Sequence, residues 1–341
     1  MKSNDILISV LMPVYNVENY IRYSIESILQ QDYARWELII VDDGSTDHSG
    51  EICDDYVLKD HRIKVFHQKN SGPLSARRRG ITEAVGEVVV FLDSDDFLED
   101  GCFSNLIEIF HNDNPDIVMY SGYIFYSDKS KRSMGYSFKR GFVEKEDVYD
   151  KIIASDEINA IWTKAIKREL LWNDATDYKP FYKNSYGEDK LQFLYPITQA
   201  RKVYYLNKEL YNYRQTPNSL IHNLDVGMIE KKLHLEVWEQ LFIYMKKWNK
   251  QDSKSLETVG LYFLRHMIST FFDTYYFIKG RAEKDKCLNY NWREVIPTFI
   301  FKYKIIRKLS IKEKIKLYTM LMHNDSLLRI LIKLKYRLRR L

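Results

Sequence analysis

Three polar clusters in the N-terminal third of the chain could do chemistry, because each follows a short hydrophobic run. They are residues 13–16 (PVYN), 42–45 (DDGS) and 93–96 (DSDD). Gathered carboxylates repel each other unless a cation or a hydrogen-bond donor compensates them, and paired oxygen ligands suit Mg²⁺ or Mn²⁺. Helix capping alone would also explain the third cluster. The strand-like run before it and the two companion clusters favour a divalent-metal site at Asp93 and Asp95.

The second cluster continues to residue 47 as DDGSTD, which is typical of a tight turn before a helix. Gly44 permits the turn, and Ser45 or Thr46 can cap the helix. Capping does not account for two consecutive carboxylates. A carboxylate at this place can accept the imide proton of a uracil, so the cluster also suits a nucleotide.

Three consecutive arginines, Arg77, Arg78 and Arg79, lie shortly after a turn signal at residues 70–73 (NSGP). A helix that starts there would present backbone N–H groups and arginine to a pyrophosphate. Successive helical residues point in different directions, so at most two of the three arginines can face one ligand.

The elements that must position these clusters alternate between two periodicities. Short β-type runs and helical spacing of apolar residues take turns up to about residue 125, which predicts βαβ units and a parallel sheet. The expected strands are 6–12, 37–41, 62–67, 87–92 and 116–120, with Pro13 ending the first, and the expected helices are 17–29, 46–58, 74–84 and a segment ending at Phe110. Ligands of an open parallel sheet bind beyond the carboxyl ends of its strands, where the three clusters stand.

The pattern changes after residue 125. We expect a loop or hairpin at 127–140, helices near 148–153 and 162–171, a helix beginning at 187–189 and a strand in 209–214. From residue 225 to the end, apolar residues keep helical spacing almost throughout. The chain is therefore expected to fold as an α/β domain followed by a helical extension.

The composition is that of a globular protein, and its charge is uneven. The chain has 341 residues, 45% hydrophobic and 29% charged, which suggests two domains. The three dispersed cysteines predict reduced thiols. We expect no secretory leader, and no membrane span because no uncharged apolar run approaches about 18 to 20 residues. Residues 281–341 hold 17 Lys and Arg against 5 Asp and Glu, a net charge of +12, which suits an anionic partner.

The order and spacing of the clusters resemble those of family 2 glycosyltransferases, inverting enzymes of the GT-A fold that use nucleotide-diphosphate sugars. The matching blocks are ISVLMPVYNVENYI, WELIIVDDGSTD, NSGPLSARRRG, GEVVVFLDSDD, GED and YNYRQTPNSLIH, and they cover about residues 6–222. The resemblance implies a Rossmann-like, mostly parallel GT-A sheet with flanking helices in residues 1–224. About 1–125 would hold the nucleotide sugar and 126–224 the acceptor, and a basic helical region, 225–341, would follow.

The resemblance also implies roles in donor binding. Pro13 and Asp43 would line the nucleobase pocket, with Asp43 pairing with the uracil, and Arg77 would approach the base or the diphosphate. Asp93 and Asp95 match the family's DxD motif. They would share the divalent metal, Mn²⁺ or Mg²⁺, with Asp95 as its direct ligand and Asp93 nearer the ribose.

The same resemblance implies a catalytic base. Asp189 matches the second acid of the family's Glu-Asp pair, and His222 matches a position that meets the metal or the diphosphate in some relatives. An acceptor hydroxyl must lose a proton as it attacks the anomeric carbon, which requires a carboxylate within hydrogen-bond reach. Helix capping for Asp189 and a packed or solvated place for His222 are the alternatives. Trp162 and Lys164 could line the acceptor side, although core packing suits Trp162 better.

The expected function is metal-assisted, inverting transfer of a hexose from a UDP-sugar to a saccharide or lipid-linked saccharide in cell-surface polysaccharide synthesis. A sugar-nucleotidyl transferase shares the sheet and the metal chemistry, but usually carries a Gly-rich loop that residues 13–16 do not provide. A non-catalytic scaffold is the other alternative, against which the intact Asp93, Asp95 and Asp189 argue. Nucleic-acid binding is not expected, because the basic residues near the C-terminus lie among Leu and Ile rather than stacking aromatics.

The C-terminal end combines a leucine stripe with a basic face. Leucines and basic residues each recur at steps of four and three, on different faces of one predicted helix: Leu327, Leu331, Leu334, Leu338 and Leu341, and Arg329, Lys333, Arg337 and Arg340. Such a helix can lie on an anionic membrane surface. We therefore expect a cytoplasmic protein, peripheral on the cytoplasmic face of the cell membrane; a terminal helix packed on the protein is the alternative.

Overall fold

The computed structural model describes residues 6–182, 186–216, 235–278, 280–290 and 304–322, together with residues 233, 294, 296, 297, 300, 301, 327 and 331. The chain divides into two compact units. The sheet unit comprises residues 1–149 and 156–219, and the helical unit comprises residues 150–155 and 220–341. The domain boundary predicted at residue 224 lies outside the described residues and stays a prediction.

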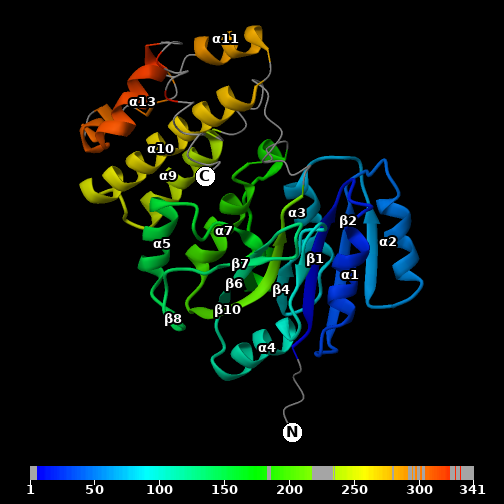
Figure 1. Cartoon of the computed structure of the whole chain (residues 1–341). Coiled ribbons are helices and arrows are strands. Elements are labelled where there is room, and N and C mark those ends of the chain that lie inside the picture. Colours follow the sequence, from blue (N-terminus) through cyan, green and yellow to red (C-terminus); the bar gives the residue numbers. More distant parts are fainter. Residues whose placement is uncertain are drawn as a thin grey trace. The chain divides into compact units, whose positions relative to one another are not determined.

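A mixed, mostly parallel sheet organises the sheet unit (Figure 1). Its strands within the described residues are β1 (Ile8–Val14), β2 (Trp36–Asp42), β3 (Ile63–His67), β4 (Val88–Phe91), β5 (Phe97–Leu98), β6 (Ile117–Phe125), β7 (Lys131–Met134), β8 (Gly141–Val143), β9 (Lys164–Lys167) and β10 (Val203–Arg214). The order is β3-β2-β1-β4-β9-β6-β10-β5, with β7 beside β6 and β8 beside β10. Strands β1 to β4 pair in parallel, and so do β6 and β10. The predicted α/β sheet is confirmed.

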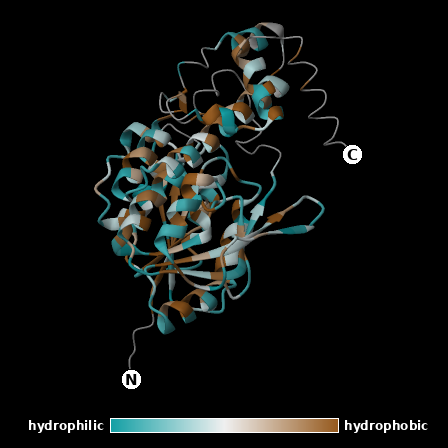
Figure 2. Cartoon of the chain, turned by 90° about the vertical axis from the view of Figure 1, so that its left-hand side faces the viewer, coloured by the Kyte–Doolittle hydropathy of each residue, from teal (hydrophilic) through white to brown (hydrophobic). Residues whose placement is uncertain are grey.

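Helices flank the sheet, since each buries an apolar face. In the sheet unit they are α1 (Ile21–Leu29), α2 (Ser49–Val57), α3 (Pro73–Glu83), α4 (Cys102–Asn112), α5 (Lys145–Ala154), α6 (Arg168–Trp172) and α7 (Glu188–Gln199). The hydrophobic residues of the strands, brown in Figure 2, lie in the interior between them. The helices predicted between the first strands are confirmed, although α1 begins later because a turn at Val17–Tyr20 precedes it.

Close packing of α3 on β1 brings the arginine run to the sheet. A Cβ on Gly80 would lie 3.3 Å from Cδ2 of Leu11, which is tighter than ordinary contact, so this position favours glycine. Arg77 lies three residues earlier and therefore on the same face of the helix. The packing of α3 on β1 therefore directs one of the three arginine side chains, that of Arg77, into the protein.

The helix predicted at 162–171 is wrong. The structure has a 3-10 turn at Ile161–Thr163, then strand β9, then the short helix α6. Strand β9 lies between β4 and β6, antiparallel to both, and Lys164, Ala165 and Ile166 are buried there. Pairing with both neighbours decides the conformation of so short a segment more strongly than local periodicity does.

Pro13 does not end the first strand, because β1 continues to Val14. Strand β4 pairs only with Ile8–Leu11, so Pro13 lies beyond that pairing, where its missing N–H breaks no ladder to β4. For the loop or hairpin predicted at 127–140, the antiparallel pairing of β6 with β7 (Lys131–Met134) shows a hairpin in the first part of the stretch. The strand predicted in 209–214 is part of β10.

The helical unit contains, within its described residues, the end of α5 together with α9 (Leu235–Lys247), α10 (Ser253–Phe277), α11 (Arg281–Asn289) and α13 (Ile311–Leu321). Aromatic side chains form much of its core, and Trp238 packs against Tyr262 and Phe263 of α10. Asp252 caps α10 by accepting from the N–H groups of Lys254 and Ser255. None of the helices described is long and apolar enough to cross a membrane.

Candidate active site

The three polar clusters meet at one edge of the sheet. Strands β2, β1 and β4 are parallel neighbours, so their carboxyl ends point the same way. The first two clusters are joined directly: the N–H of Thr46 donates to Oδ1 of Asn16 over 2.8 Å, and the N–H of Asn16 donates to Oγ of Ser45 over 3.2 Å. Pro13 lies partly buried at the end of β1 beside them. The predicted grouping of the clusters is therefore present.

Asp43 is buried and shapes the loop before α3. Its carboxylate accepts hydrogen bonds from the N–H of Ser71 (2.9 Å), the N–H of Gly72 (2.7 Å) and Nε2 of Gln68 (2.8 Å). Gly72 has φ +95°, and a Cβ there would lie 2.1 Å from the carbonyl oxygen of Tyr182, so only glycine fits. Asp43 thus holds the start of α3 in place, and its predicted pairing with uracil stays a prediction.

Asp96 holds in place the loop that carries the third cluster. Its carboxylate accepts from the hydroxyl of Tyr211 and from the N–H of Arg214, both over 2.7 Å. The N–H of Asp93 in turn donates to the Tyr211 oxygen over 3.1 Å. Burial, followed by the charges of Asp95 and Asp93, raises the pKa of Asp96 well above its usual range. Asp96 is therefore a support for the loop rather than a ligand-binding group.

The charge of Asp93 acts on Asp95, so these two carboxylates lie close together; their role as metal ligands stays a prediction. Burial, together with the charge of Asp93, raises the pKa of Asp95 to about 6. A bound cation would relieve this cost. Among the described residues, no group of three or more His, Cys, Asp and Glu side chains is arranged to hold a metal. Mg²⁺ commonly uses one or two carboxylates completed by substrate phosphates, and two carboxylates match that need.

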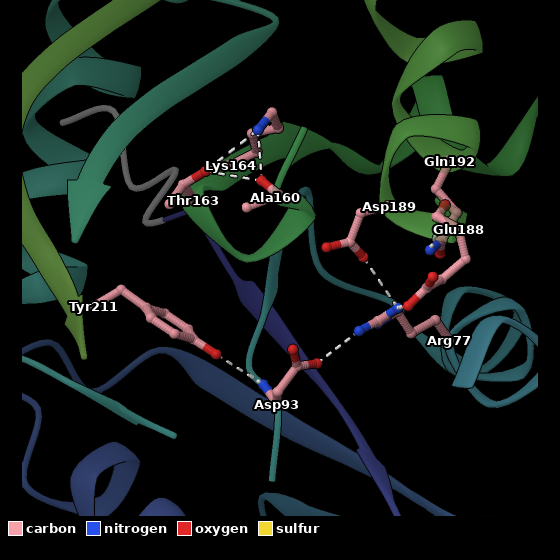
Figure 3. Close-up of polar contacts among 9 residues, drawn as sticks. All are labelled: Arg77, Asp93, Ala160, Thr163, Lys164, Glu188, Asp189, Gln192 and Tyr211. Atoms are coloured by element: carbon pink, nitrogen blue, oxygen red, sulfur yellow. Dashed lines mark hydrogen bonds and ion pairs between the residues drawn. The ribbon is translucent and has the colours of Figure 1, made fainter. Parts of the chain in front are cut away.

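Arg77 joins this pair to the other side of the site (Figure 3). One of its terminal nitrogens lies 2.7 Å from Oδ1 of Asp93, and the other lies 3.2 Å from Oδ1 of Asp189 and 3.8 Å from Oε1 of Glu188. Only 4% of the Arg77 side chain is exposed. Burial disfavours its charge, but the three carboxylates outweigh burial and raise the pKa of Arg77.

The neighbouring arginines point elsewhere, as their spacing predicts. The guanidinium of Arg78 donates to the carbonyl oxygens of Leu171 and Asp174, and that of Arg79 lies over the ring of Phe66. Arg77 alone of the three contacts the carboxylates of the site. The side chains of the three arginines therefore diverge, and the prediction that at most two of them face one ligand stays a prediction.

Glu188 and Asp189 open helix α7, directly after Gly187 with φ +75°. Burial raises the pKa of Asp189, and the charge of Asp93 adds to the rise, while Arg77 opposes it. Burial and the charge of Asp189 raise the pKa of Glu188 to about 7. The Asp189 side chain keeps 24% of its surface exposed, so an acceptor can reach it. A carboxylate with a raised pKa is a better proton acceptor than an ordinary one.

Lys164 lies near Asp189, whose charge acts on it, and it was expected on a helix, not on a strand. It is fully buried, and Nζ donates to the carbonyl oxygen of Ala160 over 2.5 Å and to Oγ1 of Thr163 over 3.2 Å. Burial lowers the pKa of Lys164 to about 7, against the charge of Asp189. A lysine inside an otherwise apolar segment was the signal in the sequence. Its role could not be deduced without the strand.

Several site residues were missed or misplaced at the level of sequence. Glu188 and Tyr211 had no assigned role, although GED and the tyrosine-rich strand contain them. Trp162 is buried, as core packing predicts, and its ring stacks 4.4 Å from Tyr211 and 5.7 Å from Tyr213. His222 lies outside the described residues, and its metal role stays a prediction.

Comparison with known proteins identifies the family. Residues 9–179 match the family described as Glycosyl transferase family 2. The chain belongs to this family, as the resemblance of its motifs predicted.

Two named relatives show how far the similarity extends. Glycosyltransferase GlyA of Streptococcus pneumoniae serotype 4 is 35% identical over 227 residues, which are 63% of this chain and 32% of GlyA. The uncharacterized glycosyltransferase EpsJ of Bacillus subtilis strain 168 is 33% identical over 227 residues, 63% of this chain and 62% of EpsJ. The chain thus spans less than two thirds of either relative.

Two solved structures share the fold. S. aureus TarS 1-349 in complex with UDP-GlcNAc aligns with a TM-score of 0.66 at 19% identity, over 97% of this chain and 91% of that one. The mannosyltransferase PcManGT from Pyrobaculum calidifontis, in complex with GDP-Man and Mn²⁺, aligns with a TM-score of 0.51 at 14% identity, over 96% and 86% of the two chains. The predicted GT-A type of fold, with C-terminal helices after the sheet, is confirmed.

Proposed function

We propose that this protein transfers a sugar from a UDP-sugar to a saccharide or lipid-linked saccharide, with inversion at the anomeric carbon and the help of a divalent metal. One observation carries the proposal. The buried Arg77 contacts Asp93, from the carboxylate pair, and Asp189, from the pair at the start of α7, at 2.7 and 3.2 Å. Groups suited to hold a leaving diphosphate and to accept a proton are therefore linked by one side chain.

The donor is proposed to be a UDP-sugar on two grounds. Asp43 and Pro13 lie at the ends of β2 and β1, where the resemblance places the nucleobase pocket. The fold is shared with TarS, whose structure contains UDP-GlcNAc. The carboxylate of Asp43 is fixed by three hydrogen bonds and would keep its orientation while it accepts a further hydrogen bond from the imide N–H of the uracil.

Asp95 and Asp93 would hold the metal, with His222 as a further proposed ligand. Support comes from the unfavourable closeness of the two carboxylates, expressed in the raised pKa of Asp95, and from the Mn²⁺ in PcManGT, which shares the fold. The metal, when bound, would neutralise charge that develops on the leaving diphosphate. Arg77 is placed to add to this stabilisation from the protein side.

The chemistry of transfer assigns the base to Asp189. The hydroxyl oxygen of the acceptor forms a bond to the anomeric carbon while the bond from that carbon to the diphosphate oxygen breaks. The diphosphate leaves with the electron pair, and the hydroxyl proton passes to the carboxylate of Asp189. A single displacement of this kind inverts the anomeric carbon. Glu188 lies beside Asp189 at the start of α7, and burial together with the charge of Asp189 raises its pKa to about 7.

The acceptor and the place of action are the finer part of the proposal. We place the enzyme on the cytoplasmic face of the cell membrane, in polysaccharide synthesis, with residues 327–341 as an amphipathic anchor beside a lipid-linked acceptor. Most of that segment lies outside the described residues, so its sequence pattern is the support. Membership of the family favours transfer over the nucleotidyl-transferase and scaffold alternatives.

A donor screen tests the proposal. UDP-sugars are incubated with the full chain, with Mn²⁺ or with EDTA, and UDP release is measured with and without added saccharide acceptors. We expect release that needs the metal, grows with an acceptor and is lost in Asp189→Asn. Metal-independent release, or nucleotide exchange with a sugar phosphate, would contradict the proposal.

A further inference from the structure

Helix α13 of the helical unit presents a row of exposed apolar side chains. The exposed residues are Ile311 (77% exposed), Ile315 (43%) and Tyr318 (56%) in the helix, and Met322 (67%), its C-cap residue. They recur at steps of four, three and four, so they lie on one face of the helix. We call these four residues the α13 stripe.

The opposite face of α13 is packed and fixed. Leu317 and Met320 are buried, and Nε of Arg265 on α10 lies 2.8 Å from Oε1 of Glu313. The ammonium of Lys316 lies 5.5 Å from the ring centroid of Phe272, also on α10. The stripe is therefore the outward face of a docked helix, and its exposure does not come from a missing partner in the core.

The start of the helix is equally well defined. Ser310 and Glu313 form a capping box, in which Oγ of Ser310 accepts from the Glu313 N–H and the Glu313 carboxylate accepts from the Ser310 N–H. A capping box stabilises the first turn of a helix. The stripe is thus a preformed surface that binding does not need to order.

The segment that carries the stripe is mostly basic, with Lys308 paired to Glu257 of α10 at 3.3 Å. Residues 304–322 contain six Lys and Arg and a single acid, Glu313, which the capping box and Arg265 already engage. At about 100° per residue, Lys312 lies on one side of the stripe and Lys314 on the other. Lys312 is exposed, and Nζ of Lys314 donates to the carbonyl oxygen of Arg307 over 2.7 Å.

An apolar row between lysines fits an anionic lipid surface. Isoleucine and methionine can enter the boundary of the acyl chains, tyrosine suits the headgroup level, and flanking lysines meet lipid phosphates. A protein partner that covered the stripe would have to compensate the lysines with acids. We propose that the α13 stripe docks the helical unit on an anionic membrane. The inference rests on the membrane location proposed above, but not on the transfer chemistry.

Vesicle binding of the full chain tests the inference. The protein is floated with vesicles of phosphatidylcholine alone and with vesicles that also contain phosphatidylglycerol, and the partition coefficient is measured. We expect binding to the anionic vesicles, reduced by about tenfold or more in Ile315→Glu/Met322→Glu. Lys312→Glu should weaken binding to the anionic vesicles and leave binding to the phosphatidylcholine vesicles unchanged. Leu58→Glu is the matched control, because it also places a glutamate at an exposed apolar position, but in the sheet unit, where Leu58 is 88% exposed. This variant should bind vesicles as the wild type does.

Other outcomes of the vesicle experiment would contradict the proposed role of the α13 stripe in membrane docking. Equal partitioning of the double variant and the wild type, or no vesicle binding by either, overturns the proposal. A wild-type dimer that the double variant converts to a monomer, with vesicle binding unchanged, would make the stripe a surface for a second copy. Metal-dependent UDP release is measured on the same samples: its loss in every sample would mark failure of the proposed reaction, whereas intact release with unchanged partitioning marks failure of the stripe alone.

Discussion

The donor side and the base side of the site use the same residue types in opposite surroundings. On the donor side, Asp43 is satisfied by two backbone N–H groups and Gln68, and Asp93 is paired with Arg77. Burial raises the pKa of Asp95 as well, but there a bound cation would offset the cost of its charge. On the base side, Glu188 and Asp189 have raised pKa values because burial is stronger than their compensation. Environment thus separates carboxylates that hold charge from carboxylates that take up a proton.

The largest expected effect concerns the donor side. Asp95→Ala removes a proposed direct metal ligand, so transfer and metal-dependent UDP binding should both be abolished, with the fold intact because the side chain does not support the loop. Binding of UDP with and without Mn²⁺ is measured by calorimetry, and the fold is checked by circular dichroism. Unchanged metal-dependent affinity would remove Asp95 from the metal site.

The base side is tested by a change that keeps size and position. Asp189→Asn cannot accept a proton, so turnover should fall by about 10² to 10⁴-fold. Steady-state kinetics with a saturating donor measure the loss. Glu188→Gln is the comparison variant, and it should lose less, because its carboxylate is not the proposed base. Equal losses in the two variants would mean that the acids act as a unit.

A substitution of Arg77 tests how much the contact of its side chain with both Asp93 and Asp189 stabilises the protein. Arg77→Met leaves Asp93, Glu188 and Asp189 without their buried partner, which should lower the free energy of unfolding by about 3 to 5 kcal/mol. Urea unfolding measures the change. Arg79→Met is the matched control in the same run of arginines; its side chain is 41% exposed, and the change should stay within about 0.5 kcal/mol. Similar losses in both variants would argue against a special role for the link.

The pH dependence of the free energy of unfolding tests whether burial lowers the pKa of Lys164, on the base side. Its pKa is about 7 in the folded protein and 10.5 as its ordinary value, so between these limits the unfolded chain binds more protons and wild-type stability rises with pH. Lys164→Met removes this dependence. Relative to wild type, the free energy of unfolding of the variant should fall by on the order of 3 kcal/mol from pH 7 to pH 10. Parallel stability curves for the two proteins would show that Lys164 is not neutralised by burial.

The donor side could be predicted from the sequence, because each of its clusters follows its own strand within a short stretch of chain. Parallel neighbours then bring Asp43 and Asp93 to one edge. Only resemblance suggested Asp189 on the base side, since its partner Arg77 lies 112 residues away in the chain. Lys164 was placed on a helix, because nothing local reveals that β9 inserts between β4 and β6.

Calorimetry of UDP binding to Asp189→Asn tests most directly whether the two sides have separate roles. The titration is done with Mn²⁺ and with EDTA, beside the wild type and Asp95→Ala. We predict wild-type, metal-dependent affinity in Asp189→Asn and none in Asp95→Ala. If Asp189→Asn loses donor binding as completely as Asp95→Ala does, Asp189 holds the donor site together through Arg77, and its assignment as the base is contradicted.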